Sequence, residues 1–371
     1  MFSIYISASA LANAYLQEGE KPYKEQSEWF RVLRKQSRIY TYGYTPTYEN
    51  QDDNIDFESG FSLSHILEEL SISYDIPIIP ADDYISSLLD NNQKALEKPN
   101  AAFFLDIDSN KAENIQKKYG VICQSTGAID SSVFTKSCIG VNFEKDTISQ
   151  KGWAEIFKVP TELPSNTLCI IDRFLFTFDG QPNKDRSLNK LGITNIAAIL
   201  EHALPISFEG IYSVLIICDK KHIKNRYIFQ TMSDELFRIV YKLSDKRRYR
   251  IKLQLLAIDG DEAPYTNSIT HNRLVFSNYY QIIFLNGVNI LYYKGGKTFS
   301  KYNQLIRGTL MYNGDLEYIE SDPPISSIET VRKLLKKQVE KWHSHVISNH
   351  FSYADSLGNF SITNLETIRF S

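Results

Sequence analysis

The chain has 371 residues, of which 43% are apolar and 23% charged, and its formal net charge is −3. This composition is typical of folded globular proteins and excludes collagen-like and intrinsically disordered chains. The longest apolar runs, such as residues 212–218, are strand-sized and fall far short of the roughly 20 residues of a membrane-spanning helix.

The first half of the chain alternates predicted strands and helices. A buried strand at residues 3–9 is followed by helices at 10–17 and 23–36, an aromatic strand at 38–44, a polar loop at 45–60 and a helix at 63–71. The clearest unit is a strand at 102–107, a helix at 110–119 and a strand at 121–124. Gly120 stands where a helix C-terminal cap belongs, because glycine adopts positive φ without steric cost. This succession predicts a parallel βαβ unit.

The second half continues the alternation. Strands are predicted at residues 167–174, 212–219 and 250–259, with helices at 194–203 and 233–242 between them. Two aromatic strands at 273–285 and 289–293 are expected to form a β-hairpin. A long final helix is predicted at 326–346, where Ser326 and Glu329 have capping-box spacing and apolar residues recur every three or four positions.

The length predicts about two domains. Pro160 and Pro164 interrupt regular structure, so we place the boundary there. The sequence thus predicts two mixed α/β domains, residues 1–158 and 159–371, the second with a basic surface and the terminal helix.

The cysteines and the start of the chain bear on its location. The four cysteines stand 15, 31 and 49 residues apart, which fits neither a zinc knuckle nor a Cys-x-x-Cys redox pair. No Lys or Arg precedes the first apolar residues, so no secretory signal is expected. We predict a cytoplasmic protein, because a reducing compartment is the simplest setting for such cysteines.

One short motif suggests phosphodiester chemistry. Residues 269–277, ITHNRLVFS, place His271 two residues before Arg273, at the start of a predicted strand that follows an α/β unit. This arrangement resembles the phospholipase D-type superfamily, in which a His-x-Lys motif followed by an Asp forms the phosphodiester site. The strands at 167–174 and 250–259 add to the resemblance, which implies a phospholipase D-like second domain.

The resemblance implies that His271 attacks phosphorus, that Arg273 holds the phosphoryl oxygens and that an acid orients the imidazole. Arginine in place of lysine keeps the charge and binds phosphate bidentately. Five residues after Arg273, however, stands Asn278, and its neighbours Ser277 and Tyr279 are not carboxylates either. We therefore expect a phosphate-binding derivative rather than a working hydrolase.

Acidic residues at strand ends leave a metal-dependent nuclease open as an alternative. Metal-dependent nucleases place Mg²⁺ ligands at the carboxyl edge of an α/β sheet. Acids stand at or just after the ends of predicted strands, at Asp106, Asp108, Asp219, Asp259, Asp261 and Glu262. Asp-Gly is also the commonest turn chemistry, so we predict no metal and no other cofactor, with Mg²⁺ implied only if the protein is a nuclease that uses Asp259, Asp261 and His271.

Residues 4–15, IYISASALANAY, resemble the opening of PIN-type nuclease domains. Those domains place an Asp at the end of the first strand, where this chain has Ser7, Ala8 and Ser9. The resemblance therefore implies a related fold without that metal site.

Basic residues gather in the second half. Residues 1–160 hold 15 Lys and Arg against 23 Asp and Glu, whereas residues 161–371 hold 26 against 21. Such asymmetry suggests a domain that faces a polyanion. The predicted nucleic-acid-binding residues are Lys220, Lys221, Lys224, Arg226, Lys246, Arg247, Arg248, Arg250 and Lys252.

The sequence therefore favours a non-catalytic protein that binds a polyanion, most simply nucleic acid, as part of a bacterial defence or nucleic-acid-processing complex. Two alternatives stay open. One is a nuclease, either phospholipase D-type or metal-dependent, and the other is a module that binds lipid head groups. Further protein subunits and self-association are also left open.

Overall fold

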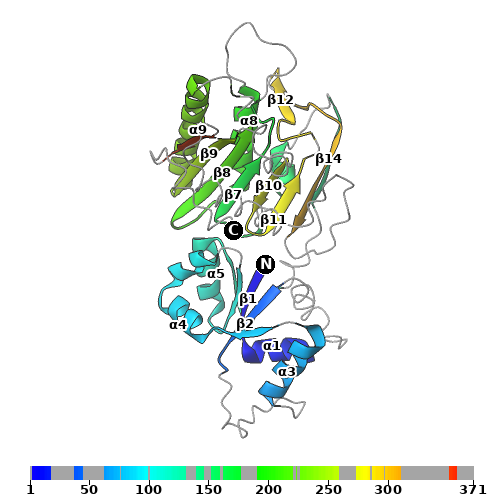
Figure 1. Ribbon diagram of the computed structural model, residues 1–371, viewed down its shortest axis with the longest axis vertical. Helices are drawn as coiled ribbons and strands as arrows, with labels where there is room; N and C mark the ends of the chain where they lie inside the picture. Colours follow the sequence, from blue (N-terminus) through cyan, green and yellow to red (C-terminus); the bar gives the residue numbers. More distant parts are fainter. Residues whose placement is uncertain are drawn as a thin grey trace. The chain divides into compact units, whose positions relative to one another are not determined.

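The computed structural model describes residues 2–17, 37–44, 62–75, 77–98, 101–130, 139–145, 152–158, 162–176, 190–219, 223, 226–258, 273–284, 286–295, 297–310 and 351–356. The protein is mixed α/β, as predicted, and divides into two compact units (Figure 1). Among the described residues, the first unit ends at Asp130 and the second begins at Ile139. This division precedes the predicted boundary at 158/159, because strand β6 (Ile139–Phe143) pairs with strand β14 (Gln304–Leu310) of the second unit.

The first unit is built on a parallel sheet. Its described strands are ordered β3-β2-β1-β4-β5, and every neighbouring pair is parallel. They are β1 (Phe2–Ser7), β2 (Ser37–Tyr42), β3 (Ile78–Pro80), β4 (Ala101–Leu105) and β5 (Ile122–Ser125). The order reverses between β1 and β4, as it does in doubly wound nucleotide-binding folds.

Helices cover this sheet, and Figure 1 shows them. They are α1 (Ala8–Leu16), α3 (Leu63–Tyr74), α4 (Asp82–Asp90), the 3₁₀ helix η2 (Asn92–Glu97) and α5 (Ser109–Tyr119). Tyr5, Phe103 and Leu105 alternate along β1 and β4 and pack in one core with residues of α4 and α5. Strands β4 and β5 with α5 form the predicted βαβ unit, and Gly120 ends α5 in the left-handed conformation, with φ of 60°.

The second unit contains a mixed sheet. Its described strands are ordered β15-β9-β8-β7-β10-β11-β14-β6. The parallel strands are β7 (Thr167–Ile171), β8 (Ile211–Asp219) and β9 (Arg250–Ile258), and the antiparallel ones are β10 (Leu274–Ser277), β11 (Tyr280–Ile283), β14, β6 and β15 (Phe351–Asp355). Strands β12 (Leu291–Lys294) and β13 (Lys297–Ser300) form a separate hairpin. Eight of the nine residues of β8 are buried, which is typical of a central parallel strand.

Helices α7 (Trp153–Ile156), α8 (Lys190–Ala203) and α9 (Arg226–Arg247) form one layer, since α7 contacts α8 and α8 contacts α9. Helix α8 connects β7 to β8, and α9 connects β8 to β9. The indole of Trp153 donates a hydrogen bond of 3.0 Å to Asn195 of α8, and the ring of Phe157 lies 6.4 Å from that of Tyr280 in β11. Aromatic contacts thus attach the helical layer to the sheet.

The structure changes some of the predicted elements. The stretch 273–285 is not one strand but the antiparallel pair β10 and β11, because the chain reverses at Asn278 and Tyr279. Helix α9 is longer than predicted at both ends. The predicted helices at 23–36 and 326–346 and the loop at 45–60 lie outside the described residues. Among the described residues, no helix is both long and apolar enough to cross a bilayer.

Candidate nucleic-acid interface

Several chemically distinctive side chains meet at the carboxyl ends of β7 and β8. Because β7, β8 and β9 are parallel, these strands end at the same edge of the sheet. Strand β10 runs the other way and starts with Leu274 opposite Ile171, so Arg273 lies at this edge as well. We call the group of Asp172, Arg173, Phe174, Asp219 and Arg273 the carboxyl edge. Ligands of open α/β sheets bind at such edges.

Asp172 is the buried carboxylate that holds the backbone of the carboxyl edge in place. It is 1% exposed and follows directly on β7. One carboxylate oxygen accepts a 2.8 Å hydrogen bond from the backbone N–H of Phe174, and the other accepts one of 2.7 Å from Val288. Burial raises the pKa of Asp172, whereas these N–H groups and the charge of Arg273 act in the opposite direction. The carboxylate thus ties the turn after β7 to the segment around residue 288.

The segment opposite Asp172 fits closely against it. Gly287 has φ of +87°, and a Cβ atom at this position would lie 2.6 Å from a carboxylate oxygen of Asp172. The side-chain amide of Asn289 donates a 2.7 Å hydrogen bond to the carbonyl of Leu175. The turn that carries Arg173 and Phe174 is therefore held at both sides by fixed contacts.

Two guanidinium groups lie over one aromatic ring at this edge. The guanidinium carbons of Arg173 and Arg273 are 5.6 and 5.2 Å from the ring centroid of Phe174, within the range of cation–π contacts. Arg173 also donates a 2.9 Å hydrogen bond through Nε to the fully buried carboxylate of Asp219. Phe174 remains 36% exposed. We call Arg173, Phe174 and Arg273 the Arg–Phe–Arg group.

The predicted catalytic residues are only partly described. Arg273 lies at the carboxyl edge, and His271 and Asp259 lie outside the described residues. Within the described ranges, no three His, Cys, Asp or Glu side chains are grouped so that they could hold a metal ion. Asp172 and Asp219 accept hydrogen bonds from N–H and guanidinium groups, so both serve the architecture of the edge.

Asn278, which stands where the resemblance would place the orienting acid, lies far from Arg273. Its side-chain oxygen accepts hydrogen bonds from the backbone N–H groups of Asn166 and Thr167 at the start of β7. Strand β7 separates this point from Asp172 by about 17 Å, at 3.3 Å per residue. Asn278 is thus a structural residue of the opposite edge.

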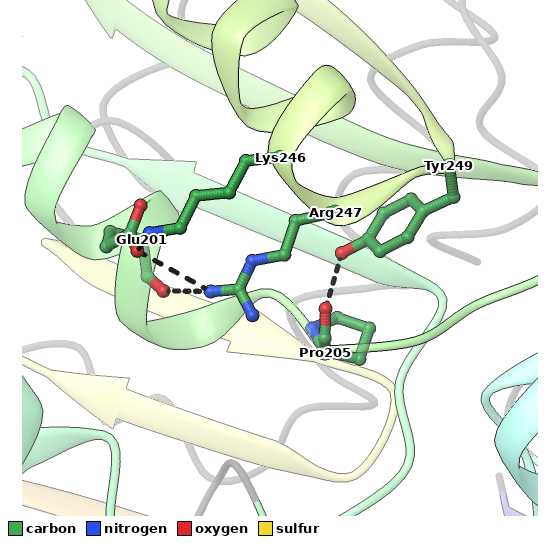
Figure 2. Close-up of polar contacts among 5 residues, drawn as sticks. All are labelled: Glu201, Pro205, Lys246, Arg247 and Tyr249. Atoms are coloured by element: carbon green, nitrogen blue, oxygen red, sulfur yellow. Dashed lines mark hydrogen bonds and ion pairs between the residues drawn. The ribbon is translucent and has the colours of Figure 1, made fainter.

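Basic side chains in the last turn of α9 form contacts with α8, and Tyr249 contacts the segment after α8 (Figure 2). Lys246 forms an ion pair with Glu201 of α8, and Arg247 donates a 2.6 Å hydrogen bond to the backbone carbonyl of Glu201. The hydroxyl of Tyr249 donates a 2.7 Å bond to the carbonyl of Pro205, and burial raises its pKa above the ordinary value. Two of the predicted binding cations therefore connect α9 to α8.

The remaining predicted binding residues differ in exposure. Lys252 is only 5% exposed, whereas Arg248 and Arg250 are exposed. Lys220, Lys221 and Lys224 lie outside the described residues, and the side chain of Arg226, the first residue of α9, is not described.

Helix α9 places the two predicted basic clusters at opposite ends. Arg226 begins the helix and Arg247 ends it, and 22 residues at 1.5 Å each make about 33 Å. Arg248 and Arg250 lie at the amino end of β9, whereas Asp219, which precedes the other cluster in the sequence, ends β8 at the carboxyl edge. The described residue of the first cluster, Arg226, therefore lies at the other end of α9 from the described residues of the second cluster.

The corresponding edge of the first unit consists mainly of capping residues. Ser7 caps α1 by accepting a 3.3 Å bond from the N–H of Ala10, and Asp108 caps α5 in the same way at 2.8 Å from Asn110. Asp106 accepts a hydrogen bond of 3.5 Å from Thr126. These side chains fix the helix starts at the point where the strand order reverses.

Sequence reasoning missed Asp172, Arg173 and Phe174 as site residues, because they lie in the stretch 167–174 that was predicted as strand throughout. The signal was present, since a charged Asp-Arg pair that follows five apolar or small residues marks the end of a buried strand. The contact of Arg273 with the ring of Phe174, 99 residues earlier in the chain, had no local signal.

No model of a known protein family matches the chain, and a search of curated proteins found no similar sequence. The likeness to phospholipase D-type and PIN-type domains therefore rests on the short sequence motifs alone.

Proposed function

We propose that this protein binds nucleic acid, a polyanion, at the carboxyl edge of its second unit and does so without catalysis. The observation that carries the proposal is the Arg–Phe–Arg group, in which two guanidinium groups lie over one partly exposed ring. Proteins that hold nucleic acid combine cations for the phosphates with aromatic side chains for the bases. Both kinds of group are present here, because Arg173 and Phe174 lie in the turn after β7 and Arg273 lies directly before β10.

The electrostatics of the chain support this choice. Residues 161–371 carry a net charge of +5, from 26 basic and 21 acidic residues, and residues 1–160 carry −8. Lys220, Lys221 and Lys224 follow Asp219 in the sequence and stay predicted contacts. At the other end of α9, Lys246 and Arg247 are engaged with Glu201, which leaves less positive charge for a ligand.

Binding of a labelled oligonucleotide, measured by fluorescence anisotropy between about 50 and 200 mM salt, tests the proposal. We expect affinity to fall steeply with salt. Arg273→Gln should weaken binding and reduce the slope of log K against log salt by about 0.7 to 0.9, the value for one phosphate contact. Arg273→Lys should retain the slope, because it keeps the charge.

The matched control is Arg248→Gln with Arg250→Gln, which removes two exposed arginines at the opposite end of α9. The sequence predicts Arg248 and Arg250 as contacts, whereas binding at the carboxyl edge should leave this double variant with the affinity of the unaltered protein. If it loses affinity while Arg273→Gln does not, the contact lies at the amino end of β9 instead. If the unaltered protein binds no oligonucleotide at low salt, the proposed function is wrong.

A further inference from the structure

Phe174 is held at the surface, although the residues that follow it are buried. It is 36% exposed, whereas Leu175 and Phe176 are 0% and 2% exposed. Its N–H bonds to Asp172, and its carbonyl accepts a 3.4 Å hydrogen bond from Asn289. Phe174 therefore presents a fixed, partly exposed ring at an edge of the sheet where ligands of α/β proteins bind.

The two arginines beside the ring are held in different ways. Arg173 is fixed by its 2.9 Å bond to Asp219, and its side chain is only 16% exposed. The guanidinium carbon of Arg273 lies 5.2 Å from the centroid of the Phe174 ring. A planar guanidinium held in place loses little conformational entropy when it stacks on a further flat group or pairs with a phosphate.

From this geometry we infer that the Arg–Phe–Arg group selects single-stranded nucleic acid, with a base stacked on the group and the adjoining phosphates next to the arginines. This inference rests on the proposed function. In a duplex the faces of the bases are covered by neighbouring base pairs, and only their edges are open in the grooves. A single strand can turn the face of a base toward an aromatic ring or a guanidinium plane. The Arg–Phe–Arg group can therefore stack on a base of a single strand but not on the covered bases of a duplex.

The ring is tested by Phe174→Leu, which keeps an apolar side chain and both arginines but removes the aromatic face. We expect its affinity for a single strand to fall roughly five- to hundredfold, the range for loss of one stacked base. Its affinity for a duplex of equal length should not change, and neither should its salt slope, because no charge is removed. Phe174→Tyr should restore single-strand binding.

The matched control is Tyr241→Leu, which removes another exposed aromatic side chain, 78% exposed on α9. It should leave both affinities unchanged. A direct readout comes from Phe174→Trp, whose added indole fluorescence should be quenched by a single strand and not by a duplex. This signal does not depend on a loss of stability.

The outcomes separate the inference from the proposed function. If the unaltered protein binds no nucleic acid, the proposed function is wrong and the inference with it. If it binds, but single strand and duplex bind equally well, or Phe174→Leu weakens both alike, binding is real and selection by the ring is overturned. Quenching of the introduced indole by the duplex would also contradict the inference.

Discussion

Asp172 determines the local geometry on which the candidate site depends. Its two oxygens accept hydrogen bonds from Phe174 in the same turn and from Val288, which is 116 residues away in the chain. Removing either partner would leave a buried polar group without its bond, a loss of about 1–3 kcal/mol. This buried carboxylate thus fixes the turn that carries Arg173 and Phe174.

Gly287→Ala tests this close fit. The new Cβ would lie 2.6 Å from a carboxylate oxygen of Asp172, at a φ of +87° that alanine rarely adopts. We expect a loss of about 1–3 kcal/mol in the free energy of unfolding from crowding, in addition to the backbone strain. Chemical denaturation of the second unit measures it.

The control for this change is Gly295→Ala. Gly295 also has positive φ, +58°, but no atom lies within 4 Å of the place that an added Cβ would take. It should show the backbone strain alone, about 1–2 kcal/mol. If both variants lose the same free energy of unfolding, Asp172 and its neighbours shift to make room for the added methyl group.

At the scale of the elements, Asn278 organises the reversal between β10 and β11. It is 0% exposed, and its side-chain oxygen accepts bonds of 3.0 and 3.2 Å from the N–H groups of Asn166 and Thr167. Its amide donates a 2.8 Å bond to the side-chain oxygen of Asn166. The turn between two antiparallel strands is thereby bonded to the start of parallel strand β7.

Asn278→Ala should therefore destabilise the second unit by at least about 2 kcal/mol, because several buried donors lose their acceptor at once. Asn303 offers a comparison, since its side chain accepts one bond from the N–H of Lys145 at an exposed position. Asn303→Ala should cost no more than about 1 kcal/mol, because water replaces the acceptor. If both variants lose a similar free energy of unfolding in urea, the burial of Asn278 does not add to the cost of losing its hydrogen bonds.

Local sequence patterns predicted the strongly apolar strands and helices. They did not predict elements whose position depends on contacts between residues far apart in the chain. The strands around Tyr212 and Leu253 and the βαβ unit with Gly120 were predicted because apolar runs and glycine caps act over a few residues. The reversal at Asn278 was missed, since its partners lie more than 100 residues earlier in the chain. Strand β6 was missed for the same reason, because its partner β14 is more than 150 residues away.

The candidate site was predictable only in part. The sequence identified Arg273, but it could not show that β10 starts beside the end of β7. It also grouped basic residues by composition, whereas the length of α9 separates them and Glu201 engages two of them. Charges near each other in sequence indicate a shared surface only when the element between them is short.

For the molecule as a whole, the charge asymmetry follows the division into two units. The division after residue 136 leaves 12 basic and 20 acidic residues in 1–136, the main part of the first unit, and 29 and 24 in 137–371. The balances of −8 and +5 are therefore the same as for the boundary expected from the sequence. The acidic unit has its own core around Tyr5 and Phe103.

This organisation predicts two separable unfolding transitions. Leu105 in β4 and Leu255 in β9 are both 0% exposed, and each belongs to the sheet of a different unit. Leu105→Ala and Leu255→Ala should each cost about 2–5 kcal/mol, and each should lower a different transition in calorimetry. A single-stranded oligonucleotide should raise only the transition that Leu255→Ala lowers, since a ligand stabilises the unit that binds it. If both substitutions shift one common transition, the two units unfold together. If the oligonucleotide raises the transition that Leu105→Ala lowers, the binding site lies in the acidic unit.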